Sequence, residues 1–76
     1  MAAFSNPEQD FLEKLGSRIK SLRVDKNISL NQFSKLHGFE KASLSRLESG
    51  KTNVTVITLL KLSQALNKPI DQFFAD

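Results

Sequence analysis

The chain has 76 residues, a net charge of +3 and no cysteine. A chain of this length forms one domain whose core contributes about 3–5 kcal/mol to stability, and such domains usually depend on disulfides, a metal or a partner subunit. The lack of cysteine excludes disulfides and thiolate metal sites, and a single histidine, His37, argues against other metal sites, so a partner subunit is expected.

The distribution of charge is more informative than its total. Residues 17–51 hold eight lysines and arginines against three acids, a difference of +5, while the other acids lie towards the ends. A basic centre favours a polyanionic partner. No apolar run is long enough to span a membrane, and the N-terminal "MAAFSNPEQD" lacks the basic start and apolar region of a signal peptide, which predicts a cytoplasmic protein.

The first expected helix begins near Pro7, with Asn6 as its N-cap and acidic residues in its first turn. Apolar residues then recur at spacings of three and four up to about Lys26. They predict one buried stripe that consists of Leu12, Leu15, Ile19 and Leu22. Residues 1–9 are interpreted as an N-terminal arm and residues 10–76 as the domain.

Two short helices are expected next. Ser29, followed by Gln32 three residues later, fits a capping box that opens a helix over 30–37. Gly38 ends it, because a left-handed residue is least strained as glycine. The expected buried residues of this helix are Phe33 and Leu36. The third helix is expected over about 41–49, ends before Gly50 and buries Leu44 and Leu47.

A fourth helix follows the polar loop "GKTN", with Thr55 as its cap and Asn67 at its end. Its expected buried stripe consists of Val56, Leu59, Leu62 and Leu66. The last segment, "PIDQFFAD", is consistent with one or two further helical turns. The sequence therefore predicts an all-α domain with five helices.

The outer face of the third helix carries chemistry that suits a DNA major groove. Two short helices joined by a glycine turn, the second with a small-polar and basic face, are typical of a helix-turn-helix. A groove about 12 Å wide admits one helix and presents acceptors on guanine, a donor and an acceptor on adenine, and a methyl group on thymine. The candidate base-contacting residues are Lys41, Ala42, Ser43, Ser45 and Arg46.

From Leu15 to Phe73 the chain resembles the Cro/repressor-type helix-turn-helix family, of the xenobiotic-response-element type. The matching segments are "LGSRIKSLR", "ISLNQFSKLHGFEKASLSRLESGK" and "TLLKLSQALNKPIDQFF". The resemblance implies a lambda-repressor-like domain of five helices that binds operator DNA, usually as a dimer, to regulate transcription. It implies no cofactor.

By the same resemblance, the start of the second helix and the loop after the third helix contact the DNA backbone. A helix N-terminus suits this role because its first N–H groups are free to bind phosphate. The expected phosphate contacts are Ser29, Leu30, Asn31, Lys51, Thr52 and Asn53, with Lys35 as a further candidate.

Three residues depart from the family pattern. Leu30 stands where glutamine is frequent, so only its backbone N–H is available to DNA. Ser34 replaces a small alanine, which should be tolerable if its hydroxyl bonds back to a carbonyl. Glu40 stands where a serine or threonine usually caps the third helix. Its carboxylate suits the helix dipole but repels phosphate, unless it accepts from a cytosine amine.

Arg23 and Glu48 are expected to form a partly buried ion pair. Glu48 lies on the face of the third helix that turns towards the first helix, where Arg23 stands. The resemblance and the helix geometry agree on this structural role, which is to align the two helices.

Apolar residues near the C-terminus predict a homodimer. Ile57 lies off the buried stripe of the fourth helix, and a helix can bury only one of two adjacent phenylalanines. The expected interface residues are Val54, Ile57, Phe73 and Phe74. A twofold axis at this surface would place two third helices about 34 Å apart and predicts a near-palindromic operator.

Other classes of function fit the sequence less well. Catalysis is not expected, because the chain has no glycine-rich phosphate loop and no serine with a plausible histidine base. The alternative is an antitoxin-like or adaptor module, whose main partner is a protein such as a toxin or polymerase and whose DNA binding is autoregulatory. A restriction–modification controller and a phage-type repressor both fit the regulator hypothesis, as do repression and activation.

Overall fold

The computed structural model describes residues 3–74, which form four α-helices and one 3-10 turn, with no strand in that range. The elements are α1 (Asn6–Asp25), α2 (Leu30–His37), α3 (Lys41–Glu48), α4 (Val56–Leu66) and η1 (Ile70–Phe73). The all-α prediction is confirmed, but the expected fifth helix is a single 3-10 turn of 4 residues. None of the helices in residues 3–74 is both long and apolar enough to cross a membrane.

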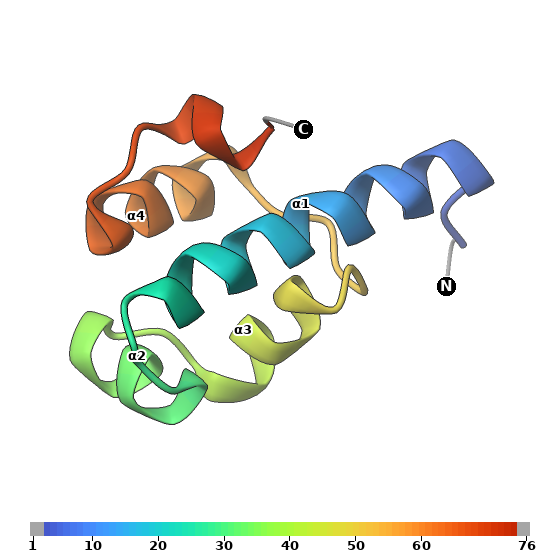
Figure 1. Ribbon diagram of the computed structural model, residues 1–76. Helices are drawn as coiled ribbons and strands as arrows, with labels where there is room; N and C mark the ends of the chain where they lie inside the picture. The colour runs from blue at the N-terminus through green and yellow to red at the C-terminus, as the bar shows by residue number, and fades with distance from the viewer. Residues whose placement is uncertain (1–2, 75–76) are drawn as a thin grey trace.

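The long helix α1 organises the molecule. Figure 1 shows it running through the middle, with α3 on one side, α4 and η1 on the other, and α2 beside its C-terminal end. Both flanking groups bury their apolar residues against α1. The core consists of Leu15, Ile19, Leu22, Phe33, Leu44, Leu47, Leu59, Leu62, Leu66 and Phe73.

The cap of α1 is Ser5, so the expected cap, Asn6, is wrong. Ser5 has an extended backbone, and its hydroxyl accepts from the Glu8 N–H at 3.3 Å while the Glu8 carboxylate accepts from the Ser5 N–H at 2.8 Å. This reciprocal pair satisfies two amide donors and starts the helix one residue early. Residues 6–9, assigned to the arm, therefore lie in α1, and residues 1–2 of the arm lie outside the described residues.

Two residues expected in the core are exposed. Leu36 is 69% exposed because the buried face of α2 passes through Phe33 and Ser34, and Leu36 lies about 110° around the helix from it. Val56 is exposed because it is the first residue of α4, about 90° away from the stripe formed by the buried leucines.

The 3-10 turn closes the bottom of the core. Phe73 is only 2% exposed, and the Nε of Arg18 in α1 donates to the carbonyl of Gln72 at 3.0 Å. Asn67 ends α4 in the left-handed conformation with φ 54°, which reverses the chain towards α1. The assignment of Phe73 to a dimer interface is therefore wrong, because its ring is used in the core of its own chain.

Candidate nucleic-acid interface

The turn between α2 and α3 is held by local hydrogen bonds. Ser29 and Gln32 form the predicted capping box at the start of α2, with bonds of 3.1 Å in both directions. Gly38 ends α2 with φ 73°, as predicted, and the N–H of Phe39 donates to the carbonyl of Ser34 at 2.9 Å. These contacts fix the angle at which α3 leaves α2.

Ser34 is buried, and its hydroxyl donates to the carbonyl of Asn31 at 2.9 Å. The condition under which a serine should be tolerated at this position is therefore met, and the bond explains how a polar side chain is accommodated in the core. The ring of Phe33 stacks on that of Phe39, with centroids 5.7 Å apart. The helix-turn-helix thus has its own small cluster of packed side chains.

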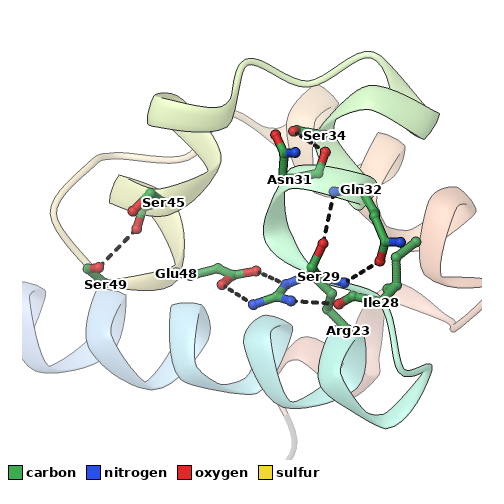
Figure 2. A network of polar contacts seen from close by, with 9 residues as sticks. All are labelled: Arg23, Ile28, Ser29, Asn31, Gln32, Ser34, Ser45, Glu48 and Ser49. Atoms are coloured by element: carbon green, nitrogen blue, oxygen red, sulfur yellow. Dashed lines mark hydrogen bonds and ion pairs between the residues drawn. The ribbon is translucent and has the colours of Figure 1, made fainter.

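A buried ion pair joins α1 to α3. The Nε and Nη2 atoms of Arg23 donate to the two carboxylate oxygens of Glu48 at 2.7 and 3.0 Å, and Nη1 donates to the carbonyl of Ile28 at 2.7 Å (Figure 2). The side chains are 8% and 6% exposed. The predicted pair is therefore confirmed, and it is more buried than expected.

Hydrogen bonding to Glu48 raises the pKa of Arg23 above its ordinary value, because the bonds favour the charged guanidinium; burial acts in the opposite direction. Arg23 therefore stays charged throughout the physiological range. The role of the ion pair is structural, because the guanidinium of Arg23 in α1 binds both α3 and the turn between α1 and α2.

The outer face of α3 is open. Lys41, Ala42, Ser43, Ser45 and Arg46 are all exposed, while Leu44 and Leu47 are buried on the opposite side. The structure thus brings all five candidate base-contacting side chains onto the solvent side of one helix. A hydrogen-bonded chain links three polar residues on this face: the Ser43 hydroxyl donates to Glu40 at 2.5 Å, and Nη2 of Arg46 donates to the Ser43 hydroxyl oxygen at 3.3 Å.

The candidate phosphate contacts differ in accessibility. Asn31, Lys35, Lys51 and Asn53 are exposed, whereas Leu30 and Thr52 are half-buried. Leu30 packs against the core, so its backbone N–H is the group that remains for DNA, as expected from the sequence. In the capping box the Ser29 hydroxyl accepts from Gln32 and the Ser29 N–H donates to Gln32, so the hydroxyl proton is the donor that remains for a phosphate.

The loop that carries Lys51 is anchored at both sides. The N–H of Lys51 donates to the carbonyl of Arg46 at 2.9 Å, and Nε2 of Gln9 in α1 donates to the carbonyl of Gly50 at 2.9 Å. Gly50 has φ 74° and lies so close to Glu13 that an added Cβ would be 2.6 Å from the Glu13 Cα. Only glycine fits this turn, which holds Lys51 beside the end of α3.

The surface of α4 is apolar on the side away from the core. Ile57 is 60% exposed, as predicted, and Val56 and Leu60 share its side of the helix. Phe74 is 48% exposed and stacks on Phe11 of α1, with ring centroids 5.9 Å apart. Val54 is half-buried against the core.

A helix-turn-helix family model, HTH_3, matches residues 19–73. The chain belongs to this family. The uncharacterized HTH-type transcriptional regulator y4dJ of Sinorhizobium fredii is 40% identical over 57 residues, which cover 75% of this chain and 74% of that protein. The HTH-type transcriptional repressor RghR of Bacillus subtilis is 33% identical over 79% of this chain and 45% of that protein.

A solved structure shows the same architecture. The restriction-modification controller protein C.AhdI from Aeromonas hydrophila superimposes with a TM-score of 0.78 and 32% identity, over 83% of this chain and 96% of that chain. The family resemblance inferred from the sequence is thus confirmed, and the relatives are transcriptional regulators and a controller protein. In residues 3–74, no group of three or more side chains is placed to hold a metal ion.

Sequence reasoning missed three residues that hold the elements around this helix-turn-helix in place. Gly16 lies where α1 crosses α3, and an added Cβ would overlap the backbone carbonyls of Leu47 and Glu48. Gln9 holds the loop after α3, and Arg18 holds η1. An isolated glycine within a helical pattern was the available signal for Gly16, since such a glycine usually has a packing reason.

Proposed function

We propose that this chain is a sequence-specific regulator of transcription that binds double-stranded operator DNA as a homodimer, with α3 in the major groove. The observation that carries the proposal is the two-sided character of α3. Its apolar side is locked to α1, and its other side presents lysine, arginine, serine and alanine to solvent. These side chains match the donor, acceptor and methyl groups of base edges.

In this proposal α3 supplies base contacts through Lys41, Ala42, Ser43, Ser45 and Arg46. The backbone contacts come from the two segments that flank it in the fold. One is the N-terminus of α2, whose first amides have no partner within the helix. The other is the anchored loop after α3. The proposed backbone contacts are Ser29, Leu30, Asn31, Lys35, Lys51, Thr52 and Asn53.

The homodimer is proposed on the apolar surface of α4 and the adjoining η1. Val56, Ile57 and Leu60 are exposed on one side of α4, and Phe74 is exposed after η1. Several exposed apolar side chains on so small a domain are typical of an interface. Val54 lines one hollow together with Phe74, and it completes the proposed surface.

A protein partner in place of a second copy is the alternative, as in an antitoxin-like or adaptor module. The observation that favours it is a hollow of about 520 Å³ between the start of α1 and the end of η1. Its lining is mostly apolar and includes Phe4, Phe11, Leu12, Val54 and Phe74. The hollow shares Val54 and Phe74 with the proposed dimer surface. The association state of the purified chain therefore distinguishes a homodimer from a monomer that binds another protein through the hollow.

A salt titration tests the DNA-binding proposal directly. Neutralising DNA phosphates releases counterions, so the logarithm of the association constant should fall linearly with the logarithm of salt concentration, by about 0.9 per phosphate contact. The measurement is duplex binding by fluorescence anisotropy between low and physiological salt. A flat slope, or no binding to any duplex selected from a random pool, would overturn the proposal.

A further inference from the structure

The start of α3 differs from the start of the other three helices. Ser5, Ser29 and Thr55 each accept a hydrogen bond from the backbone N–H three residues on, at 3.3, 3.1 and 3.1 Å. Glu40 holds the same position before α3 but makes no such bond. A missing cap costs about 1 kcal/mol of helix stability, so this carboxylate is used for something other than capping.

Glu40 directs its carboxylate along the outer face of α3. The Ser43 hydroxyl donates to its Oε1 at 2.5 Å, and Arg46 donates to the same hydroxyl oxygen. A serine hydroxyl has one proton, so Ser43 is left with acceptor capacity only. The second carboxylate oxygen of Glu40 makes no hydrogen bond or ion pair with any residue in 3–74, and the side chain is exposed.

A free carboxylate on a DNA-reading face is selective because it has no donor. It repels phosphates and the acceptor atoms of guanine and thymine, and it is attracted by an exocyclic amine. Adenine N6 lies between two acceptors, its own N7 and the O4 of the paired thymine. Cytosine N4 has an acceptor on one side only, so cytosine is the base edge that suits a carboxylate best.

We propose that Glu40 is a specificity-determining residue that accepts a hydrogen bond from the N4 amine of a cytosine in the major groove. Ser43 holds the carboxylate at the N-terminal end of α3, the end whose residues reach base edges in helix-turn-helix proteins. The hydrogen bond from Nη2 of Arg46 to the Ser43 hydroxyl is long, at 3.3 Å, so Arg46 can leave Ser43 and bind a guanine instead. This inference rests on the proposed function, since it assigns one base contact within it.

The test compares base preferences of Glu40 variants by selection from a random duplex pool. For the wild type we expect one position in each half-site at which cytosine is preferred at least about fivefold. Glu40→Ala should abolish that preference. Glu40→Gln should shift it to adenine, because an amide can pair with N6 and N7 together. Asp25→Asn removes one negative charge from another exposed acid and should leave the profile unchanged.

A third Glu40 variant separates base reading from folding. Glu40→Ser supplies a capping hydroxyl, so its melting temperature should rise above that of the wild type while the cytosine preference is lost. Unchanged profiles for all three Glu40 variants would overturn the inference and leave the proposed function standing. A change confined to the position that Arg46→Ala alters would also overturn it, because Glu40 would then act only through Arg46. Absence of duplex binding by the wild type would remove the proposed function itself.

Discussion

Arg46 and Lys51 lie close together at the end of α3 but are held differently. Arg46 projects from the helix face and can exchange its serine contact for a base, whereas Lys51 lies on a loop fixed by Gln9 and the carbonyl of Arg46. A planar guanidinium pairs with guanine O6 and N7, while a phosphate carries no base identity. The two residues are therefore expected to contribute differently to specificity.

We predict that Arg46→Ala costs about 1–3 kcal/mol on the cognate site and relaxes discrimination at one base position. Lys51→Ala should weaken binding to cognate and scrambled duplexes by similar factors. Equilibrium titrations of both variants on both duplexes measure the difference. Equal losses on the two duplexes for Arg46→Ala would show that α3 is not the helix that reads bases.

Arg23 is the residue whose loss should be most damaging to folding. Arg23→Ala leaves the Glu48 carboxylate buried and unpaired, which costs about 3–5 kcal/mol. That is about the whole stability expected of so small a core. We predict that this variant is largely unfolded at room temperature by far-UV circular dichroism.

Lys20→Ala is the matched control for Arg23→Ala, because Lys20 is an exposed cation on the same helix. It should change the free energy of unfolding by less than about 0.5 kcal/mol. Since the pKa of Arg23 is raised, the stability that this shift contributes is present at every pH below the ordinary pKa of arginine and is lost only above it. A cooperative, stable Arg23→Ala domain would show that the pair is dispensable.

At the scale of elements, α1 and α3 can approach closely where they cross because Gly16 has no side chain. Gly16→Ala adds a Cβ that overlaps the carbonyls of Leu47 and Glu48. The gain in helix propensity, about 1 kcal/mol, is smaller than the strain of separating two packed helices, about 1–3 kcal/mol. We predict net destabilisation by urea unfolding, and reduced DNA binding because α3 is displaced.

Ser17→Ala is the control for this crossing, since Ser17 is an exposed neighbour in α1 and gains the same kind of propensity. It should be neutral or slightly stabilising. If Gly16→Ala were as stable as Ser17→Ala, the close approach of α1 and α3 would not contribute to the fold.

Most of these elements could be predicted from the sequence because their signals are local. The leucine spacings and the caps at Ser29 and Thr55 predict four α-helices with nearly their observed ends. Leu36 and Val56 were misplaced because their exposure depends on which face a neighbouring helix covers. Periodicity could not decide which of Phe73 and Phe74 is buried, since adjacent residues point to different sides.

The candidate site was predictable to a similar degree and for the same reason. One short helix with two buried leucines determines which of its residues face outward, and the structure places all five candidate base contacts there. The roles of those residues towards DNA stay predictions. The anchors Gln9 and Arg18 were not predictable, because each contacts a backbone carbonyl far away in the chain.

At the scale of the whole molecule, we expect the apolar surface of α4 to decide the association state. Ile57→Glu combined with Phe74→Glu places two carboxylates in the proposed interface, whose burial is unfavourable without partners. We predict a folded monomer with much weaker operator binding. Sedimentation equilibrium at micromolar concentration measures the state of the double variant and of the wild type.

Leu36→Glu provides the control for surface hydrophobicity, because Leu36 is at least as exposed but lies on α2, away from the proposed interface. It should leave the wild-type association state unchanged. A wild type that sediments as a monomer both free and on DNA would contradict the dimer, and the prediction of a near-palindromic operator would fail with it.

The guanidinium of Arg23 bonds to α3 and to the carbonyl of Ile28 in the α1–α2 turn, so three segments are joined before any DNA is present. None of these three segments then has to fold during association, and the heat capacity of binding should reflect mainly the surface that protein and duplex bury together. Isothermal calorimetry at several temperatures would give this quantity. The change of shape needed for a close fit would then occur mainly in the DNA duplex. The local stiffness of the duplex would therefore contribute to sequence recognition.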